Sequence, residues 1–444
     1  TELNKYIEAL HKEYPFGLSL YDAIIHYQLT DVEPCFDIPS SYLDNLDKDR
    51  FSHWEDAIES LVSTANACGH PYLHPLTGIS IREYSSAIKE EALQTLATFI
   101  GLLTAIQSKL PVFSALLENT DIHPTRKDFN IISAIIRKIL DIPELTPELL
   151  TTPLLNETLE EYRKVTEHGR KRDEIKAEIE NGFTKEVLKI NAGPMLAEWN
   201  RVSAQWFLPR YFGQRKIKKV IRPYALQPVK PETVQPLLHQ VIRYQEELDF
   251  TDRYAAKLPS LFGRFGRDEE WPIIDQIIHE VSSLHSLLLS YSKDVAKTSR
   301  IKQNLALQLT EGIRTFRDIH SHSLNELYQL VDTLTATEQR LSTTLGITVE
   351  TLYTNSADWI GIALQQAGIW KENLDKLKDW YQWLQSYNKL NELGLGFIAE
   401  EYKEKNIPTD LLTSSFRKSF YQAVIHYIIA KEPTLELFLS LIHI

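Results

Sequence analysis

The sequence predicts an all-α protein, and three of its features point that way. Apolar residues recur at steps of three and four through most of the chain, which is the period of a helix and not of a strand. Glycine makes up only 16 of 444 residues, about half of its usual ~7%, and so few glycines suit long helices. No proline occurs between Pro272 and Pro408. We therefore expect an elongated multi-helix bundle.

The first third of the chain predicts helices separated by short loops. These helices cover residues 3–10, 18–29, 54–69 and 84–110. Ser19 or a neighbour is placed to cap the second of them. The proline- and glycine-containing stretch 69–78 predicts an ordered turn. The fourth helix is expected to end before Pro111, because proline lacks the N–H that continues a helix. Later prolines separate shorter helices at Pro124, Pro143, Pro147 and Pro153.

The middle of the chain contains one long charged run, residues 154–181, whose central turns are polar on every side. Such a helix usually projects into solvent. Residues 272–345 differ, because apolar residues from Ile277 to Val295, and again beyond Leu324, alternate steps of four and three. That spacing is typical of a coiled coil. We expect one or two very long helices here, together ~100 Å long, forming an antiparallel coiled-coil-like stalk.

These changes of character predict three contiguous regions. They are an N-terminal helical bundle over 1–153, a long charged helix with a basic and aromatic helical region over 154–270, and stalk helices with a C-terminal bundle over 271–444. The sequence opens at Thr1, and an apolar helical stripe from Phe416 to Ile442 meets no stop signal. We interpret it as a fragment of a larger protein.

Composition limits the functions to consider. A net charge of −12 and a pI near 5.7 argue against nucleic-acid binding by the whole surface, but permit a local basic patch. No run of ~18 apolar residues is free of charge, and no basic segment precedes an apolar one at the start. Cys35 and Cys68 are too few for a disulfide framework. We expect a cytoplasmic protein that does not span a membrane.

Sequence motifs for nucleotide binding and metal binding are mostly absent. No G-x-x-x-x-G-K-[ST] occurs, and Gly394-Leu395-Gly396 lacks the lysine that would have to follow. We therefore expect no cofactor, no metal and no catalytic residue in this segment. His279 and the Glu after it could begin the zinc-binding motif H-E-x-x-H, in which both histidines lie on one face of a helix. The next histidine, His285, lies ~240° further round the helix and therefore on a different face.

Two small sets of residues have a structural alternative. Cys68, His70 and His74 have the chemistry of zinc ligands, yet no second ligand pair follows, so an ordered proline-rich corner explains them better. A second set of aromatic residues falls largely on one helical face and predicts core packing. Its members are Trp370, Trp380, Trp383 and Tyr387.

Two arginine–histidine pairs have the R-x4–6-H spacing of helical ribonucleases of the HEPN group. They are Arg163 with His168, and Arg314 with His320. In that group the two side chains act on the RNA 2′-hydroxyl and phosphate in a dimer cleft, without a metal. Chance matches are expected among 14 histidines, and His320 falls in an apolar register. A metal-independent ribonuclease is therefore a minor alternative.

The strongest local signal is electrostatic. Residues 199–231, the basic–aromatic window, contain no Asp or Glu, although the chain has 60 acidic residues. Cations interleaved with aromatic rings fit a phosphate backbone with unstacked bases. The candidate nucleic-acid-binding residues are Arg201, Trp206, Arg210, Tyr211, Arg215, Lys216, Lys218, Lys219 and Arg222. Five or six phosphate contacts would lower affinity about a thousandfold between low and moderate salt. Alternatively, the aromatic residues are core and the cations meet acidic helices elsewhere.

Several short motifs, spread in order over nearly the whole chain, resemble large bacterial superfamily 1 helicase-like proteins. They are Leu3-Asn4-x-Tyr6 with Leu10-His11, Gly17-Leu18-Ser19-Leu20-Tyr21, His74-Pro75-Leu76 with Tyr84-Ser85, Ala204-x-Trp206-Phe207-Leu208-x-Arg210, Leu261-Phe262-Gly263 with Trp271, and Phe416-x-x-Ser419-Phe420-Tyr421. Each motif is short, and the ordered set carries the resemblance.

The resemblance implies a helical insertion in the first RecA-like domain, between the Walker A and Walker B motif blocks. Its partners would be nucleic acid, DNA rather than RNA, and the RecA-like ATPase domains of the same parent chain. ATP and Mg²⁺ would belong to the parent, and no ATPase residue falls in this segment. The predicted function is a non-catalytic accessory domain that guides nucleic acid or couples ATPase motion to a partner. The alternative is a purely structural or protein-interaction scaffold.

Overall fold

The computed structural model describes residues 2–117, 123–151, 157–262, 270–353, 356 and 358–438. Within them the protein is all-α, as predicted: helices and short 3-10 turns contain most residues, and no strand occurs among them. They form two compact units, Thr1–Thr104 with Thr333–Ile444 (unit 1) and Ala105–Asp332 (unit 2). Unit 1 thus combines both ends of the chain. The contiguous three-part division stays a prediction, and its boundary at 153 lies outside the described residues.

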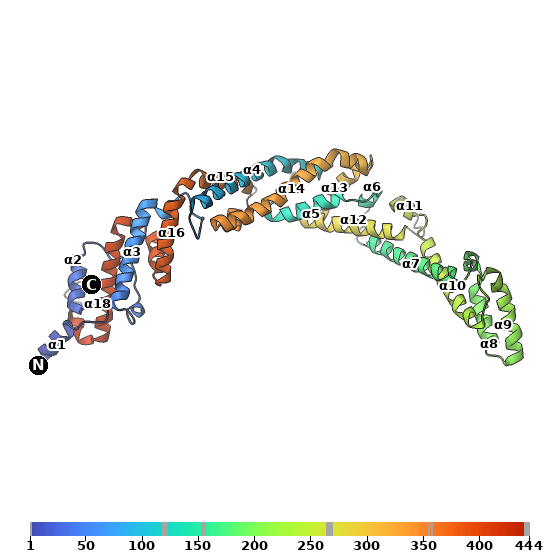
Figure 1. Ribbon diagram of the computed structural model, residues 1–444, viewed down its shortest axis with the longest axis horizontal. Helices are drawn as coiled ribbons and strands as arrows, with labels where there is room; N and C mark the ends of the chain where they lie inside the picture. The colour runs from blue at the N-terminus through green and yellow to red at the C-terminus, as the bar shows by residue number, and fades with distance from the viewer. Residues whose placement is uncertain are drawn as a thin grey trace. The chain divides into compact units, whose positions relative to one another are not determined.

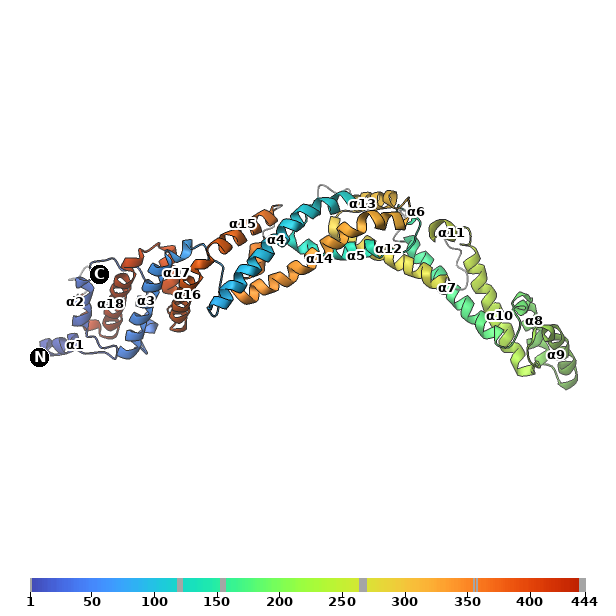
Figure 2. The ribbon, with the colours of Figure 1, turned by 45° about the horizontal axis from the view of Figure 1, so that its top comes forward.

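Unit 1 is a bundle of helices. Its helices are α1 (Glu2–Leu10), α2 (Leu20–Leu29), α3 (Lys48–Cys68), the first part of α4 (Ser86–Leu116), the last part of α14 (Ile313–Leu345), α15 (Trp359–Glu372), α16 (Leu377–Glu392), α17 (Gly396–Glu404) and α18 (Leu412–Lys431). Helix α3 packs against α16 and α18, and α18 also packs against α2 (Figures 1 and 2). Their contact faces bury Ile58, Leu61, Phe416 and Phe420.

The predicted cap and the predicted turn of unit 1 are both confirmed. The Ser19 hydroxyl accepts a hydrogen bond from the Asp22 N–H (3.2 Å), and the Asp22 carboxylate accepts one from the Ser19 N–H (3.1 Å), which closes a capping box at α2. Helix α3 ends at Cys68, and a 3-10 turn, Pro71–Leu73, follows it. This ordered corner leads the chain across to α4.

The tryptophan set is core, as predicted. Trp380 donates from Nε1 to the Ile79 carbonyl (2.9 Å), and Trp370 donates to the Thr77 carbonyl (3.1 Å), so both indoles hold the 69–79 corner against α15 and α16. The His74 ring is buried and stacks on Trp380, with centroids 4.7 Å apart. Burial lowers the His74 pKa, because charging the imidazole there would cost solvation.

Unit 2 contains the remaining helices. They are the last part of α4, α5 (Phe129–Leu140), α6 (Pro147–Thr151), α7 (Glu157–Glu180), α8 (Ala192–Ser203), α9 (Phe207–Ile221), α10 (Pro231–Asp252), α11 (Leu258–Phe262), α12 (Trp271–Ser292), α13 (Val295–Gln308) and the first part of α14. Helix α12 packs against α5, α7 and α13, and α7 also packs along α10 (Figures 1 and 2).

The prediction that the charged run projects into solvent is wrong. Helix α7 packs on two neighbours because its central turns contain a narrow uncharged face with Val165, Thr166 and Gly169. A Cβ added at Gly169 would lie 2.2 Å from the Trp271 ring, so α7 and α12 approach as closely as they do only because this residue is glycine. In the sequence, the long charged side chains next to this narrow face made the helix appear polar on every side.

Two predicted helix limits are also wrong. Helix α4 runs through Pro111 to Leu116, because Ile106 and Phe113 bury side chains on both sides of the proline and keep the helix in register. Helix α18 ends at Lys431, because Pro433 disfavours helical dihedral angles at the residue before it. Of the predicted C-terminal stripe, Leu439 and Ile442 lie outside the described residues, as does Pro153 of the proline series.

Residues 272–345 form three helices, so the predicted one or two very long helices are interrupted. Lys293 ends α12 in a left-handed conformation (φ 54°), and the Asp294 carboxylate caps α13 by accepting from the Lys297 N–H (2.7 Å). Val295 consequently begins a new helix and is 70% exposed, outside the predicted coiled-coil face. The other apolar positions of that spacing, such as Val281 and Leu288, are buried.

One described helix, α4, is long and apolar enough to cross a bilayer by length and composition alone. Only 28% of its most apolar 18-residue window is buried. The core helix of a soluble protein passes the same test, so this observation is weak evidence for a membrane span.

Candidate nucleic-acid interface

The basic–aromatic window contains the end of α8, all of α9 and the turn after it, and it packs on α10 in unit 2. Trp199 and Val202 on α8 are buried, as are Ile217 and Ile221 on α9, in one cluster with Val234, Leu238 and Val241 of α10. Gly213 lets α9 approach α8, since a Cβ there would lie 2.6 Å from Val202. Only this narrow side of α9 is covered.

The aromatic residues at the start of α9 are exposed. Trp206 is 68% exposed, Phe207 75%, Tyr211 54% and Phe212 62%. The alternative that the aromatic residues of the window are core is therefore wrong for these four, although it holds for Trp199. Exposed apolar residues gathered in one place usually mark a binding surface. Tyr211 and Phe212 also contact each other edge to face, with centroids 5.6 Å apart.

The basic residues on α9, and Arg222 directly after it, form no ion pair in the part of the chain that the structure describes. This holds for Arg210, Arg215, Lys216, Lys218, Lys219 and Arg222, none of which forms an ion pair there. Lys216 nevertheless lies near Glu198 of α8 and, after the hydrogen bond from Arg201, helps to lower the pKa of that carboxylate, so the alternative that the cations meet acidic helices within the chain stays open. All lie on the solvent side except Lys218, which is half-buried. Cations that are free of carboxylates can bind phosphates without first losing a partner.

Arg201 is the exception among the predicted residues. Its guanidinium binds the Glu198 carboxylate within α8 through two hydrogen bonds, of 2.8 and 2.7 Å. This pairing raises the pKa of Arg201 and lowers that of Glu198, the hydrogen bond being the main cause in both. Arg201 therefore contributes less to the positive field than the cations of α9 do. The window contains no acid, but Glu198 lies one residue before it.

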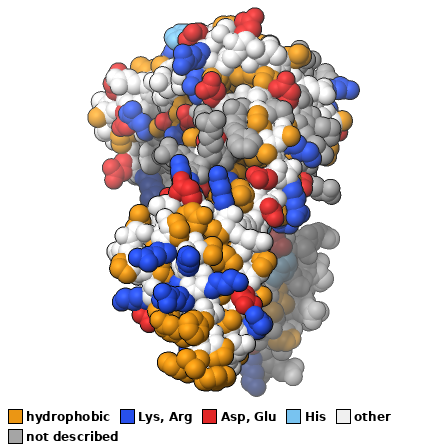
Figure 3. Space-filling view, turned by 90° about the vertical axis from the view of Figure 1, so that its right-hand side faces the viewer, with side chains coloured by type: hydrophobic (Ala, Val, Ile, Leu, Met, Phe, Trp, Pro, Cys, Tyr) orange, Lys and Arg blue, Asp and Glu red, His pale blue; other side chains and the backbone are white. Residues whose placement is uncertain are grey.

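The two kinds of side chain are only partly separated along α9. Phe207, Tyr211 and Phe212 lie in its first two turns together with Arg210, and the other cations follow toward its C-terminal end, all outside the buried side that contains Ile217 and Ile221. Figure 3 shows this end of unit 2: apolar side chains gather at the lower edge, and Lys and Arg side chains lie next to them with few acids between. We call the exposed aromatic residues Trp206, Phe207, Tyr211 and Phe212, with the six unpaired cations, the α9 surface.

The sequence did not reveal three further exposed apolar side chains. They are Leu208 and Val220 on α9, and Leu226 after it. Aliphatic residues are expected in the core by default, so only their position away from the Ile217 and Ile221 side indicates exposure. They widen the apolar part of the α9 surface.

No metal site appears among the described residues, since none of their His, Cys, Asp and Glu side chains form a group of three or more that could hold an ion. Cys68, His70 and His74 each have packing contacts of their own. The His70 ring stacks on Tyr402, His74 on Trp380, and burial raises the pKa of the Cys68 thiol to about 11. The proline-rich corner is a packing feature.

The two arginine–histidine pairs have packing contacts of their own. Arg163 pairs with Glu160 (3.2 Å), while the His168 ring contacts the Glu247 carboxylate and lies on Phe250. The His320 ring lies against Phe316, and burial lowers its pKa. These contacts account for both histidines without a substrate, and the ribonuclease stays an untested alternative.

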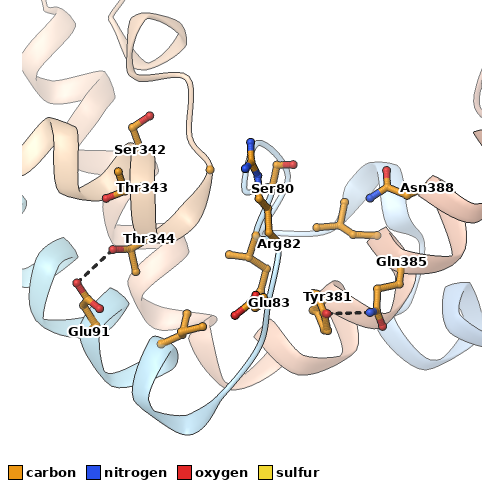
Figure 4. Close-up of a pocket in the computed structure, with 14 residues that line it drawn as sticks. Ser80, Arg82, Glu83, Glu91, Ser342, Thr343, Thr344, Tyr381, Gln385 and Asn388 are labelled. Atoms are coloured by element: carbon orange, nitrogen blue, oxygen red, sulfur yellow. Dashed lines mark hydrogen bonds between the residues drawn. The ribbon is translucent and has the colours of Figure 1, made fainter.

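Unit 1 contains a polar groove of about 990 Å³ (Figure 4). Its lining comes from the loop at Ser80–Glu83, from α4, from the end of α14 and from α16. Hydroxyl and amide groups predominate, with Gln385 donating to the Tyr381 hydroxyl (2.7 Å) and Thr344 to Glu91 (3.4 Å). The charges of Arg82, Glu83 and Glu91 have both signs, so this groove is a weaker match to a polyanion than the α9 surface is.

The sequence was compared with protein-family models, with curated proteins and with solved structures. No family model matches the chain, and neither a curated protein nor a solved structure matches it. The resemblance to superfamily 1 helicase-like proteins therefore stays a prediction, and the α9 surface has to be interpreted from its own chemistry.

Proposed function

We propose that this chain is a non-catalytic helical accessory domain that contacts single-stranded nucleic acid through the α9 surface. The observation that carries this proposal is the exposure of four aromatic rings next to six cations that form no ion pair among the described residues. Cations follow a phosphate backbone, and aromatic rings stack on unpaired bases.

The chemistry of the surface favours single strands over duplex. The side chains of Phe207 and Phe212 have no hydrogen-bonding group, so they cannot form hydrogen bonds to base edges in a groove. They stack on base faces instead, and these faces are accessible only where bases are unpaired. Stacking tolerates any base, so the binding is expected to depend little on sequence. DNA is the proposed ligand, in line with the helicase-like resemblance.

The wider context of the proposal is a superfamily 1 helicase-like ATPase. The ordered motifs from Leu3 to Tyr421 support it, and ATP, Mg²⁺ and the RecA-like partner domains would belong to the parent chain. The accessory domain would then guide a strand or couple ATPase motion to a partner. A G-x-x-x-x-G-K-[ST] motif encoded upstream of Thr1 would support this context, and a different domain there would contradict it.

Fluorescence anisotropy with a labelled oligothymidylate tests the nucleic-acid contact. At about 0.7 released counterions per phosphate, five or six contacts predict roughly a hundredfold to three-hundredfold weaker binding at about 200 mM salt than at about 50 mM. A blunt duplex of the same length should bind more weakly at both. The double variant W206A/F207A should bind the single strand roughly ten- to a hundredfold more weakly, because stacking contributes ~1–3 kcal/mol per base.

The matched control is L29A/L73A, which removes two side chains that are just as exposed but lie in unit 1. It should bind the oligonucleotide as the unaltered chain does. If the unaltered chain binds neither single strand nor duplex at low salt, the proposal fails. The exposed Trp, Tyr and Arg side chains would then indicate a protein interface, as the scaffold alternative expects.

A further inference from the structure

A second basic feature adjoins the C-terminal end of α9. The Thr184 N–H donates to the Tyr224 carbonyl (2.7 Å), the Leu226 N–H donates to the Gly182 carbonyl (3.0 Å), and Phe183 and Ala225 form an antiparallel bridge between them. These bonds place the 3-10 turn Lys185–Lys189 next to the turn Arg222–Tyr224, in which α9 ends.

The Lys185–Lys189 turn presents its lysines to solvent because its middle residues are held inside. Val187 and Leu188 are buried, and Gln245 of α10 donates from Nε2 to the Leu188 and Ile190 carbonyls, both at 2.9 Å. Lys185 and Lys189 remain exposed. The turn is thus fixed to α10 while its two lysines stay exposed. The Thr184 hydroxyl and, to a smaller extent, these two lysines lower the pKa of Glu186 between them.

A hollow of about 250 Å³ lies beside this turn, and we call it the lysine hollow. It is lined by Lys176, Lys185, Glu186, Leu188, Lys189, Tyr244 and Leu248. This lining contains three lysines and one glutamate, and Lys185 and Lys189 are its exposed lysines. Its cations come from α7 and the 3-10 turn, and not from the basic–aromatic window.

We propose that a single strand bound to the α9 surface continues past Arg222 into the lysine hollow, where Lys185 and Lys189 bind two of its phosphates. The inference rests on the proposed function and extends it from one helix to a defined path. The order along that path is aromatic rings, the cations of α9, Arg222 and then the lysine hollow. Charge complementarity and the backbone hydrogen bonds between the segments before and after the two turns are the grounds for it.

The length of α9 makes the path testable. Fifteen helical residues extend about 22 Å, and a stacked strand advances about 3.4 Å per nucleotide, so roughly six nucleotides cover α9. An oligothymidylate of that length is held at α9 alone. A strand of about eighteen nucleotides is long enough to reach the lysine hollow as well.

The experiment compares the unaltered chain with K185A/K189A, using both oligothymidylates over a salt series. The long strand should bind the variant about tenfold more weakly, and the slope of log affinity against log salt should be smaller by about 1.4, the value for two lost phosphates. The short strand should bind both proteins equally. The matched control, K164A/K171A, removes two exposed lysines from α7 away from the 3-10 turn and should change neither strand's binding.

The outcomes separate the two proposals. If the long strand binds K185A/K189A with unchanged affinity and unchanged slope, the path through the lysine hollow is wrong while the α9 contact stands. If K185A/K189A binds both strands more weakly by the same factor, the path is also contradicted, because the short strand does not reach the hollow. If the unaltered chain binds no oligonucleotide, the proposed function itself fails, and the path fails with it.

Discussion

Replacing Arg215, Lys216, Lys218 and Lys219 by glutamate is expected to lower the affinity for a single strand by about a thousandfold or more at low salt. Four phosphate contacts are lost, and each is worth roughly half to one decade of affinity under these conditions. The four new carboxylates repel the backbone in addition. The residual binding should also lose most of its salt dependence, which fluorescence anisotropy over a salt series measures directly.

A second quadruple variant controls for net charge. K371E, K376E, K378E and K389E change the charge by the same amount but lie exposed in unit 1, on α15, the turn after it and α16. If binding depends on the α9 surface, this control should lose far less affinity than the α9 variant. Equal losses would show that overall charge, and not a defined surface, controls binding. Circular dichroism of both variants confirms that the helices are retained.

The substitution G346A is expected to destabilise unit 1 by about 3 kcal/mol or more. Gly346 has φ +62°, which costs an L-residue about 1–2 kcal/mol. An added Cβ would also lie 2.0 Å from the Ser80 carbonyl oxygen, and this is backbone that cannot turn aside. The Ser80 N–H donates to the Leu345 carbonyl (2.9 Å), so displacing residue 80 breaks this hydrogen bond and lowers the free energy of unfolding by a further ~1 kcal/mol.

Gly101 offers the matched control for this prediction. It also belongs to unit 1, it lies within α4, and nothing lies within 4 Å of an added Cβ, so G101A should stabilise the helix by about 0.5–1 kcal/mol. Urea unfolding followed by peptide-resolved hydrogen exchange assigns each change to its unit. A loss below ~1 kcal/mol for G346A would contradict the close contact between residues 80 and 346.

Local chemistry made the helices of this chain predictable, and tertiary packing decided where several of them end. Ser19 with Asp22 forms its cap within four residues, so the sequence alone predicts it. The continuation of α4 past Pro111 depends instead on burial of Phe113 in the core. Likewise α7 appears solvated in the sequence, since its partners α10 and α12 are distant along the chain.

The candidate site was predictable in position but not in exposure. Lack of acids between residues 199 and 231 identified the window from composition alone. Composition does not distinguish Trp199, which is buried against α10, from Trp206, which faces solvent. It also missed the pairing of Arg201 with Glu198, because the acid lies just outside the window. The lysine hollow was missed because contacts between residues 182–184 and 224–226 create it.

The most direct test of the central claim is to map where a bound strand touches the protein. An oligothymidylate containing 5-bromouracil is bound at low salt and irradiated, and the cross-linked peptides are identified by mass spectrometry. Cross-links at Trp206, Phe207, Tyr211 or Phe212 are predicted, because bases stacked on these rings lie in van der Waals contact with them. Cross-links confined to unit 1, or none from a strand shown to be bound, would contradict the proposal that the α9 surface binds nucleic acid.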